Sequence, residues 1–146
     1  MRDIDTVIFD LGEVLIPWNP RRLYRKLFAD EAAMERFLSD ICNPPWNLLQ
    51  DAGRSLAEGT AERVAAFPEF EALIRAYYGR WDEMLGEPEA ASLSLLEDLK
   101  RGGYRLLALT NWSAETFGKT RPLYPLLETF EGIVVSGVEG VVKPDP

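Results

Sequence analysis

The sequence TVIFDLGE at residues 6–13 is an apolar run that ends on an acid and a glycine. Continuous apolar runs of this kind are typical of strands buried within a parallel sheet. In open α/β sheets, ligands bind outside the carboxyl ends of the strands. Asp10 stands at that end, and Gly12 would let the backbone approach a ligand closely. Asp10 is therefore a candidate nucleophile, although an isolated acid after a strand more often serves a turn or a cap.

Two further apolar runs end on polar residues in the same way. Residues 104–109 (YRLLAL) are followed by Thr110 and Asn111, and residues 132–136 (GIVVS) precede a short glycine-containing loop that leads to Lys143. Helical patterns separate the three predicted strands, and strands separated by helices pair in parallel through right-handed crossovers. The sequence thus predicts an α/β fold, with a Rossmann-like parallel sheet whose polar strand ends meet at one edge.

A long helical block separates the first two predicted strands. Ser55 begins a capping-box pattern for one of its helices, and the Asn-Pro-Pro run at 43–45 predicts a helix stop. A block inserted directly after the candidate nucleophile would overhang the carboxyl end of the sheet as a lid. We therefore predict a discontinuous core at residues 1–16 and 88–146 and an α-helical cap at residues 17–87.

Composition limits the classes of partner and the compartment. The chain has 146 residues, of which 47% are hydrophobic, and a formal net charge of −8. The negative charge argues against binding to nucleic acid or to an anionic membrane surface, whereas a small anionic metabolite remains a possible partner because a site has its own local field. No stretch is long and apolar enough to span a bilayer. A single cysteine is typical of a reducing compartment, so we expect a cytoplasmic location.

The sequence contains no histidine. This excludes Ser-His-Asp and Cys-His chemistry within the chain, as well as His-ligated zinc. Cys42 therefore has no histidine to activate it and is a poor candidate nucleophile. Asp10, Thr110 and Lys143 instead supply a carboxylate nucleophile, a hydroxyl donor and a cation. Such a set suits nucleophilic attack on an anionic substrate.

The polar strand ends occur within three motifs. The runs VIFDLGEVL at 7–15, LTNWS at 109–113 and KPDP at 143–146 resemble motifs one, two and three of the haloacid dehalogenase-like hydrolase superfamily. Their order, spacing and strand context all agree, and the resemblance covers the whole chain. The segment between the first two motifs is similar to the helical cap that this superfamily inserts after motif one.

The resemblance implies a role for each motif residue. Asp10 would be the catalytic nucleophile, Lys143 would stabilise the reacting centre, and Thr110 and Asn111 would bind substrate. For the phosphatase members it also implies Mg²⁺, held by the Asp10 carboxylate and the Gly12 backbone carbonyl. Both are hard oxygen ligands of the type that Mg²⁺ prefers.

Gly12 departs from the phosphatase pattern. Phosphatases of the superfamily usually carry an aspartate two residues after the nucleophile, where it protonates the departing alkoxide. An alkoxide needs that proton and a halide does not. Gly12 therefore favours a dehalogenase. The phosphatase hypothesis requires instead that Glu13 supplies the proton or that the phosphate has a leaving group that needs none.

A second departure concerns the superfamily's fourth motif, an acidic pair that follows another strand and completes the Mg²⁺ site. The sequence ends at Pro146 before such a strand, and Asp145 belongs to the third motif. From this we expect either that the chain is truncated before motif four or that another chain complements it, for example in a dimer. The first strand would then be an uncovered apolar edge.

Three functions remain open from the sequence. The leading hypothesis is a Mg²⁺-dependent phosphatase of a small phosphorylated metabolite. The alternatives are a metal-independent 2-haloacid dehalogenase, and a catalytically inactive fragment or binding module. Arg54, beside Gly53 in a predicted cap loop, is a candidate substrate-binding residue that reaches from the cap into the site.

Overall fold

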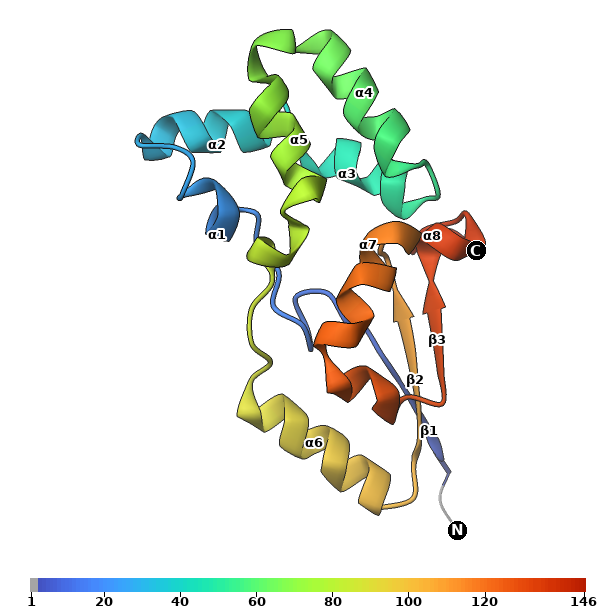
Figure 1. Cartoon of the computed structure of the whole chain (residues 1–146). Helices are drawn as coiled ribbons and strands as arrows, with labels where there is room; N and C mark the ends of the chain where they lie inside the picture. Colours follow the sequence, from blue (N-terminus) through green and yellow to red (C-terminus); the bar gives the residue numbers. More distant parts are fainter. Residues whose placement is uncertain (1–2) are drawn as a thin grey trace.

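The computed structural model describes residues 3–146 and has two lobes, a sheet lobe and a helical lobe (Figure 1). The first and last described residues belong to the sheet lobe. The described residues form a three-stranded parallel sheet in the order β1-β2-β3. The strands are β1 (Thr6–Phe9), β2 (Arg105–Thr110) and β3 (Gly132–Val135). The predicted α/β fold and the parallel pairing are confirmed.

The register aligns the carboxyl ends of the strands. Phe9 lies beside Ala108, and Thr110 lies beside Val135. Polar residues that follow the strands are therefore delivered to one edge of the sheet. This edge faces the helical lobe (Figure 1).

Helices cover one face of the sheet. They are α6 (Ala90–Arg101) and α7 (Ala114–Thr120), with the short 3-10 turns η3 (Arg121–Leu123) and η4 (Pro125–Thr129). Leu106 and Ala108 are buried beneath these elements because alternate side chains of β2 point to this side. The helix α8 (Ser136–Glu139) follows β3 directly.

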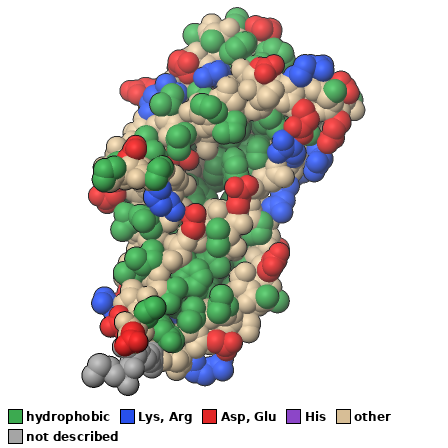
Figure 2. All heavy atoms as spheres, turned by 180° about the vertical axis from the view of Figure 1, so that it is seen from behind, with side chains coloured by type: hydrophobic (Ala, Val, Ile, Leu, Met, Phe, Trp, Pro, Cys, Tyr) green, Lys and Arg blue, Asp and Glu red, His purple; other side chains and the backbone are tan. Residues whose placement is uncertain are grey.

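The opposite face of the sheet carries exposed apolar side chains. Ile8, Leu109 and Val134 come from the three strands, and Ile8 is 63% exposed. Figure 2, which views the molecule from behind, shows hydrophobic side chains gathered on the sheet lobe. Parallel sheets normally have both faces covered, so this face is unusual.

The helical lobe consists of residues between β1 and α6. Its elements are α1 (Arg21–Tyr24), α2 (Glu31–Asp40), α3 (Pro44–Asp51), α4 (Leu56–Ala66), α5 (Glu71–Gly79), and the 3-10 turns η1 (Pro68–Phe70) and η2 (Trp81–Met84). As predicted, the Ser55 side chain caps α4 by accepting a hydrogen bond from the Glu58 amide, at 3.1 Å. None of the helices among the described residues is long and apolar enough to cross a membrane.

The predicted helix stop at 43–45 is confirmed, because α2 ends at Asp40, before this run. The same run also begins a helix, since the Asn43 side chain caps α3 by accepting a hydrogen bond from the Trp46 amide at 3.0 Å. The prolines occupy the first turn, where a missing N–H costs nothing and the fixed φ suits a helix. Their position therefore begins a helix that the sequence analysis did not include.

Aromatic side chains form the interior of the helical lobe. Tyr24 and Phe37 pack with ring centroids 5.0 Å apart, and Trp46 packs edge-on against Tyr77 at 5.1 Å. Two of the buried rings have satisfied polar groups: the Tyr24 hydroxyl donates to the Leu73 carbonyl at 2.7 Å, and the Trp46 indole N–H donates to the Gly59 carbonyl at 3.0 Å. This satisfies the requirement that buried polar groups be hydrogen-bonded.

Two chain segments connect the lobes and run side by side. Trp18 and Leu85 form an antiparallel bridge. The Asn19 amide donates to the Met84 carbonyl at 2.9 Å, and the Gly86 amide donates to the Pro17 carbonyl at 2.8 Å. The paired connection holds the helical lobe over the carboxyl edge of the sheet.

Candidate active site

Asp10 follows β1 at the edge that faces the helical lobe. Its carboxylate Oδ1 accepts a hydrogen bond from the Leu11 amide at 2.8 Å. The side chain is 48% exposed, so a ligand can reach it. The residue after it, Leu11, is fully buried and fixes the turn that presents the carboxylate.

Lys143 reaches Asp10 from the far end of the chain. Its Nζ lies 3.3 Å from Asp10 Oδ1 and donates to the Leu109 carbonyl at 2.8 Å. Asn111 holds the Lys143 backbone at two points. Its Oδ1 accepts from the Lys143 amide at 2.9 Å, and its Nδ2 donates to the Lys143 carbonyl at 3.2 Å. The structure thus brings together three of the residues that the sequence predicted, one from each motif.

A pocket of about 250 Å³ lies over these residues, between the two lobes. Gly12 and Glu13 line it beside Asp10, and α3 contributes Asn47 and Asp51. The remaining lining residues are Trp18, Trp81, Asn111, Trp112 and Lys143. Charged groups at the sheet edge therefore face an aromatic wall.

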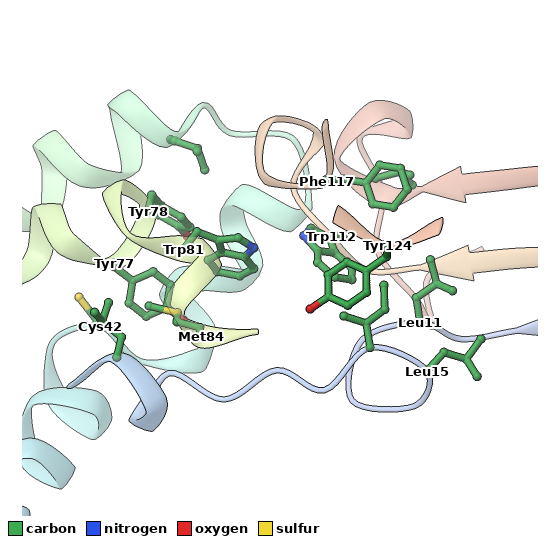
Figure 3. Close-up of a cluster of buried hydrophobic side chains, with 14 of the residues drawn as sticks. Leu11, Leu15, Cys42, Tyr77, Tyr78, Trp81, Met84, Trp112, Phe117 and Tyr124 are labelled. Carbon is green, nitrogen blue, oxygen red and sulfur yellow. The ribbon is translucent and has the colours of Figure 1, made fainter. Parts of the chain in front are cut away.

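The three tryptophans carry polar groups as well as apolar faces. Trp81 packs edge-on against Trp112 with ring centroids 6.4 Å apart, and Trp18 lies 5.5 Å from Trp81. Figure 3 shows the Trp81 and Trp112 indole nitrogens turned toward the space between the two rings. Among the described residues, none of the three indole N–H groups has a hydrogen-bond partner. Because buried donors usually find acceptors, these three unpaired groups are unusual.

Two predicted substrate-binding residues do not line the pocket. Thr110 ends β2 with its side chain 1% exposed. Within residues 3–146 its hydroxyl finds no hydrogen-bond partner. Arg54 instead donates to Gln50 Oε1 at 2.8 Å and lies 3.6 Å from Glu62. The structure therefore places Arg54 in contacts within the helical lobe, and substrate binding by either residue stays a prediction.

Asp51 is a pocket residue that the sequence analysis did not select. It is the last residue of α3, the helix that the double proline concealed. Burial raises the pKa of Asp51 to about 6. The Ser113 backbone N–H has the opposite and smaller effect, because its hydrogen bond to the carboxylate lowers the pKa. The signal that could have found it is the spacing of Asn47 and Asp51, which places both on one face of a helix.

Cys42 lies away from this pocket, in the interior of the helical lobe. It is a free cysteine and is 2% exposed. Burial raises the pKa of its thiol to about 12. Because the thiolate is the nucleophilic form, the structure supports its exclusion from catalysis.

The residues at Asp10 fit part of a magnesium site. The Asp10 carboxylate and the Gly12 carbonyl are oxygen donors of the kind that Mg²⁺ takes. Among residues 3–146 no group of three acidic, histidine or cysteine side chains could hold a metal ion. Mg²⁺ is commonly held by one or two carboxylates together with water and substrate phosphate. The two donors are therefore enough for a site that water and substrate complete, but not for one made of protein ligands alone.

Solved structures with a similar fold include haloacid dehalogenase (HAD) family enzymes. A HAD family enzyme from Bacteroides thetaiotaomicron matches with a TM-score of 0.68 at 21% identity, over 99% of this chain and 74% of that chain. Its complex with magnesium and inorganic phosphate matches with a TM-score of 0.67 at 24% identity, over 98% and 74%. The chain has the haloacid dehalogenase-like fold. The fold that the motif resemblance implies is thereby confirmed.

Other proteins similar to this HAD-like chain are hydrolases of two kinds. A sesquiterpene phosphatase of Aspergillus oryzae is 27% identical over 150 residues, which span 94% of this chain and 67% of that protein. A dehalogenase of known structure matches with a TM-score of 0.57 at 18% identity, over 100% of this chain and 68% of that chain. No family model matches the sequence.

Proposed function

We propose that this HAD-like chain acts as a Mg²⁺-dependent phosphatase of a small phosphorylated metabolite, with Asp10 as the nucleophile. The observation that carries the proposal is the Asp10–Lys143 pair, 3.3 Å apart at the edge of a pocket of about 250 Å³. A carboxylate beside a fixed cation in a partly enclosed site can attack an anionic substrate that would otherwise repel it.

The reaction would proceed through a phosphorylated aspartate. The Leu11 amide and Lys143 both bind Oδ1 of Asp10, so we assign the attack on phosphorus to Oδ2. The phosphorus–oxygen ester bond breaks, and water then releases phosphate from Asp10. Lys143 offsets the negative charge that gathers on the phosphoryl oxygens. Magnesium, when held by the Asp10 carboxylate and the Gly12 carbonyl, would neutralise further charge there.

The pocket wall supports a substrate with an apolar organic part. Trp18, Trp81 and Trp112 line the pocket together with the charged residues, and aromatic walls bind apolar groups. The similarity to a sesquiterpene phosphatase supports a phosphate ester of this character.

Phosphate release from aryl and alkyl phosphates, measured with Mg²⁺ and after chelation by EDTA, tests the proposal. We expect turnover that requires Mg²⁺ and that Asp10→Asn reduces at least about 10³-fold, because the nucleophile is lost. Asp98→Asn is the matched control, since Asp98 is an exposed acid of α6, and it should leave turnover unchanged. Turnover that survives Asp10→Asn would contradict the proposal.

Dehalogenation of a 2-haloacid is the second candidate, favoured by Gly12. Gly12 has no side chain that could protonate a leaving group. Displacement of a halide needs no such proton, whereas hydrolysis of an alkyl phosphate does. Halide release from 2-chloropropionate in the presence of EDTA would replace the phosphatase assignment. Binding of Mg²⁺ and phosphate without turnover of either substrate class would instead identify a binding module.

A further inference from the structure

Transfer of a phosphoryl group from an alkyl ester to Asp10 leaves an alkoxide, which is a poor leaving group unless it is protonated. Gly12 has no side chain to donate that proton. The acid must therefore come from elsewhere on the pocket wall. Apart from Asp10, only Glu13 and Asp51 bring carboxyl groups to the lining among the described residues.

We propose that Asp51, at the end of α3 in the helical lobe, is the general acid of this site. The inference rests on the proposed function, because it assigns one step of the phosphatase reaction. Asp10 approaches the pocket from the sheet edge and Asp51 from the helical lobe. Because phosphoryl transfer requires an in-line arrangement, the ester oxygen lies on the side of phosphorus away from Asp10, and we place it toward the lobe that carries Asp51.

The Asp51 side chain is held in place by its neighbours. Asn47, one turn earlier on α3, has its Nδ2 3.5 Å from Asp51 Oδ2. The Tyr78 hydroxyl fixes Asn47 in turn, because it donates to Asn47 Oδ1 at 2.7 Å. The Asp51 backbone carbonyl accepts a hydrogen bond from the Ser136 hydroxyl at 2.6 Å, which joins α3 to the sheet lobe. A general acid needs such positioning within reach of its substrate.

The protonation state of Asp51 suits a donor. Burial raises the pKa of its carboxyl to about 6, so a larger fraction carries a proton near neutrality than for an ordinary aspartate. The Ser113 N–H acts in the opposite direction but is the smaller effect. The other titratable groups that face it are Tyr77 and Tyr78 of α5 and, across the pocket, Asp10, Glu13 and Lys143.

The proton balance closes over the two steps. In the first step, Asp10 Oδ2 forms a bond to phosphorus and the phosphorus–oxygen ester bond breaks. The alkoxide oxygen keeps the electron pair of the broken bond and takes the proton of Asp51. In the second, the Asp51 carboxylate takes a proton from the water that attacks the aspartyl phosphate. Asp51 is thus restored, and the net reaction consumes one water and yields an alcohol and phosphate.

Glu13 is the competing carboxylate and differs in its setting. It is exposed to solvent and has a φ of 63°, in the left-handed region that non-glycine residues seldom adopt. Its place is therefore set by the turn after β1, and among residues 3–146 its side chain makes no hydrogen bond or ion pair. Glu13→Gln is accordingly the matched control for Asp51→Asn.

The test compares two substrates of different leaving group. With 4-nitrophenyl phosphate the leaving group needs no proton, whereas with a primary alkyl phosphate it does. We expect Asp51→Asn to lower kcat for the alkyl ester by about 10²- to 10⁴-fold and to change kcat for the aryl ester less than about 10-fold. The aryl turnover also shows that the variant is folded. Glu13→Gln should not produce this selective loss.

Two further measurements use the same substrates. For the unaltered chain, the ratio of alkyl to aryl kcat should fall as pH rises above about 6, because Asp51 loses its proton there. Adding Gly12→Asp to the Asp51→Asn variant should raise its kcat for the alkyl ester at least about 10-fold, because the new carboxyl group can protonate the leaving alkoxide. There is room for the new side chain, because a Cβ at Gly12 would meet only the Trp112 ring, at 4.0 Å.

Failure of this inference is distinguishable from failure of the proposed function. Suppose that phosphatase turnover depends on Asp10 but that Asp51→Asn affects both esters equally, or neither of them. This result overturns the role of Asp51 and leaves the proposed function intact. A selective loss caused by Glu13→Gln moves the role to Glu13 and also overturns the role of Asp51. Absence of phosphatase turnover in the unaltered chain overturns both proposals.

Discussion

Lys143 serves the site through a single ammonium group. Its Nζ contacts the Asp10 carboxylate at 3.3 Å and the Leu109 carbonyl at 2.8 Å, while Asn111 fixes its backbone. The cation is therefore prepositioned and needs no rearrangement when an anionic substrate arrives. At this scale, the proposed chemistry depends on the charge of the Lys143 ammonium group rather than on the surrounding packing.

Replacement of Lys143 by alanine removes that charge. We expect Lys143→Ala to lower kcat about 10²- to 10³-fold, the usual cost of losing one preorganised donor in an active site. The fold should persist because the side chain is part-exposed. Steady-state kinetics with 4-nitrophenyl phosphate measure the effect, and Lys100→Ala at the end of α6 is the control. Equal activity of the two variants would contradict a role for Lys143 in the reaction.

The loop after β2 and the turn into α8 support the site at the scale of elements. The Ser136 hydroxyl accepts from the Trp112 amide at 2.9 Å, and the Gly137 amide donates to the Trp112 carbonyl at 3.0 Å. A Cβ on Gly137 would lie 2.8 Å from the Trp112 carbonyl and would also collide with the Ala114 amide. Glycine is therefore required there for close packing.

This close packing predicts opposite outcomes for two glycines. Gly137→Ala should destabilise the chain by about 2 kcal/mol, because neither backbone segment can move away without strain, and it should also reduce activity by shifting Trp112. Gly118→Ala in α7 has open space around its Cβ, so it should stabilise by about 0.5–1 kcal/mol through helix propensity. Urea unfolding measures both. Equal stability of the two variants would contradict the packing argument.

The exposed face of the sheet is a property of the whole molecule. Ile8, Leu109 and Val134 together form an apolar surface on the side that α6 and α7 do not cover. Contiguous apolar surface of this kind promotes association between molecules. β1 adds an unpaired edge, since it lies at the end of the sheet order.

We expect Ile8→Lys to reduce aggregation, because it places a charge on both the exposed face and the edge strand. The free energy of unfolding should change by less than about 0.5 kcal/mol, as for other exposed positions. Static light scattering against protein concentration measures the association. Leu123→Lys, at an exposed apolar residue of η3 away from the sheet, should leave it unchanged. Similar scattering from both variants would show that the sheet face is not responsible.

The sequence predicted the parallel sheet, because each strand is a continuous apolar run and helices separate the strands. It also predicted that Asp10, Asn111 and Lys143 belong to strand ends, and the register of the sheet brings them together. Arg54 is placed differently, because Gln50 and Glu62 offer it closer partners than the pocket does. A charged side chain in a loop gives no sequence signal for which partner it will choose.

By itself, then, the sequence determined the elements of the sheet lobe, because these depend on local patterns of a few neighbouring residues, and it singled out Asp10 as the candidate nucleophile. Only the tertiary structure decided what stands opposite Asp10. Asp51 and the three tryptophans come from separate segments, and packing of the helical lobe against the sheet edge brings them to one pocket. The same packing buries Asp51 and raises its pKa, an effect of surroundings that no local pattern contains.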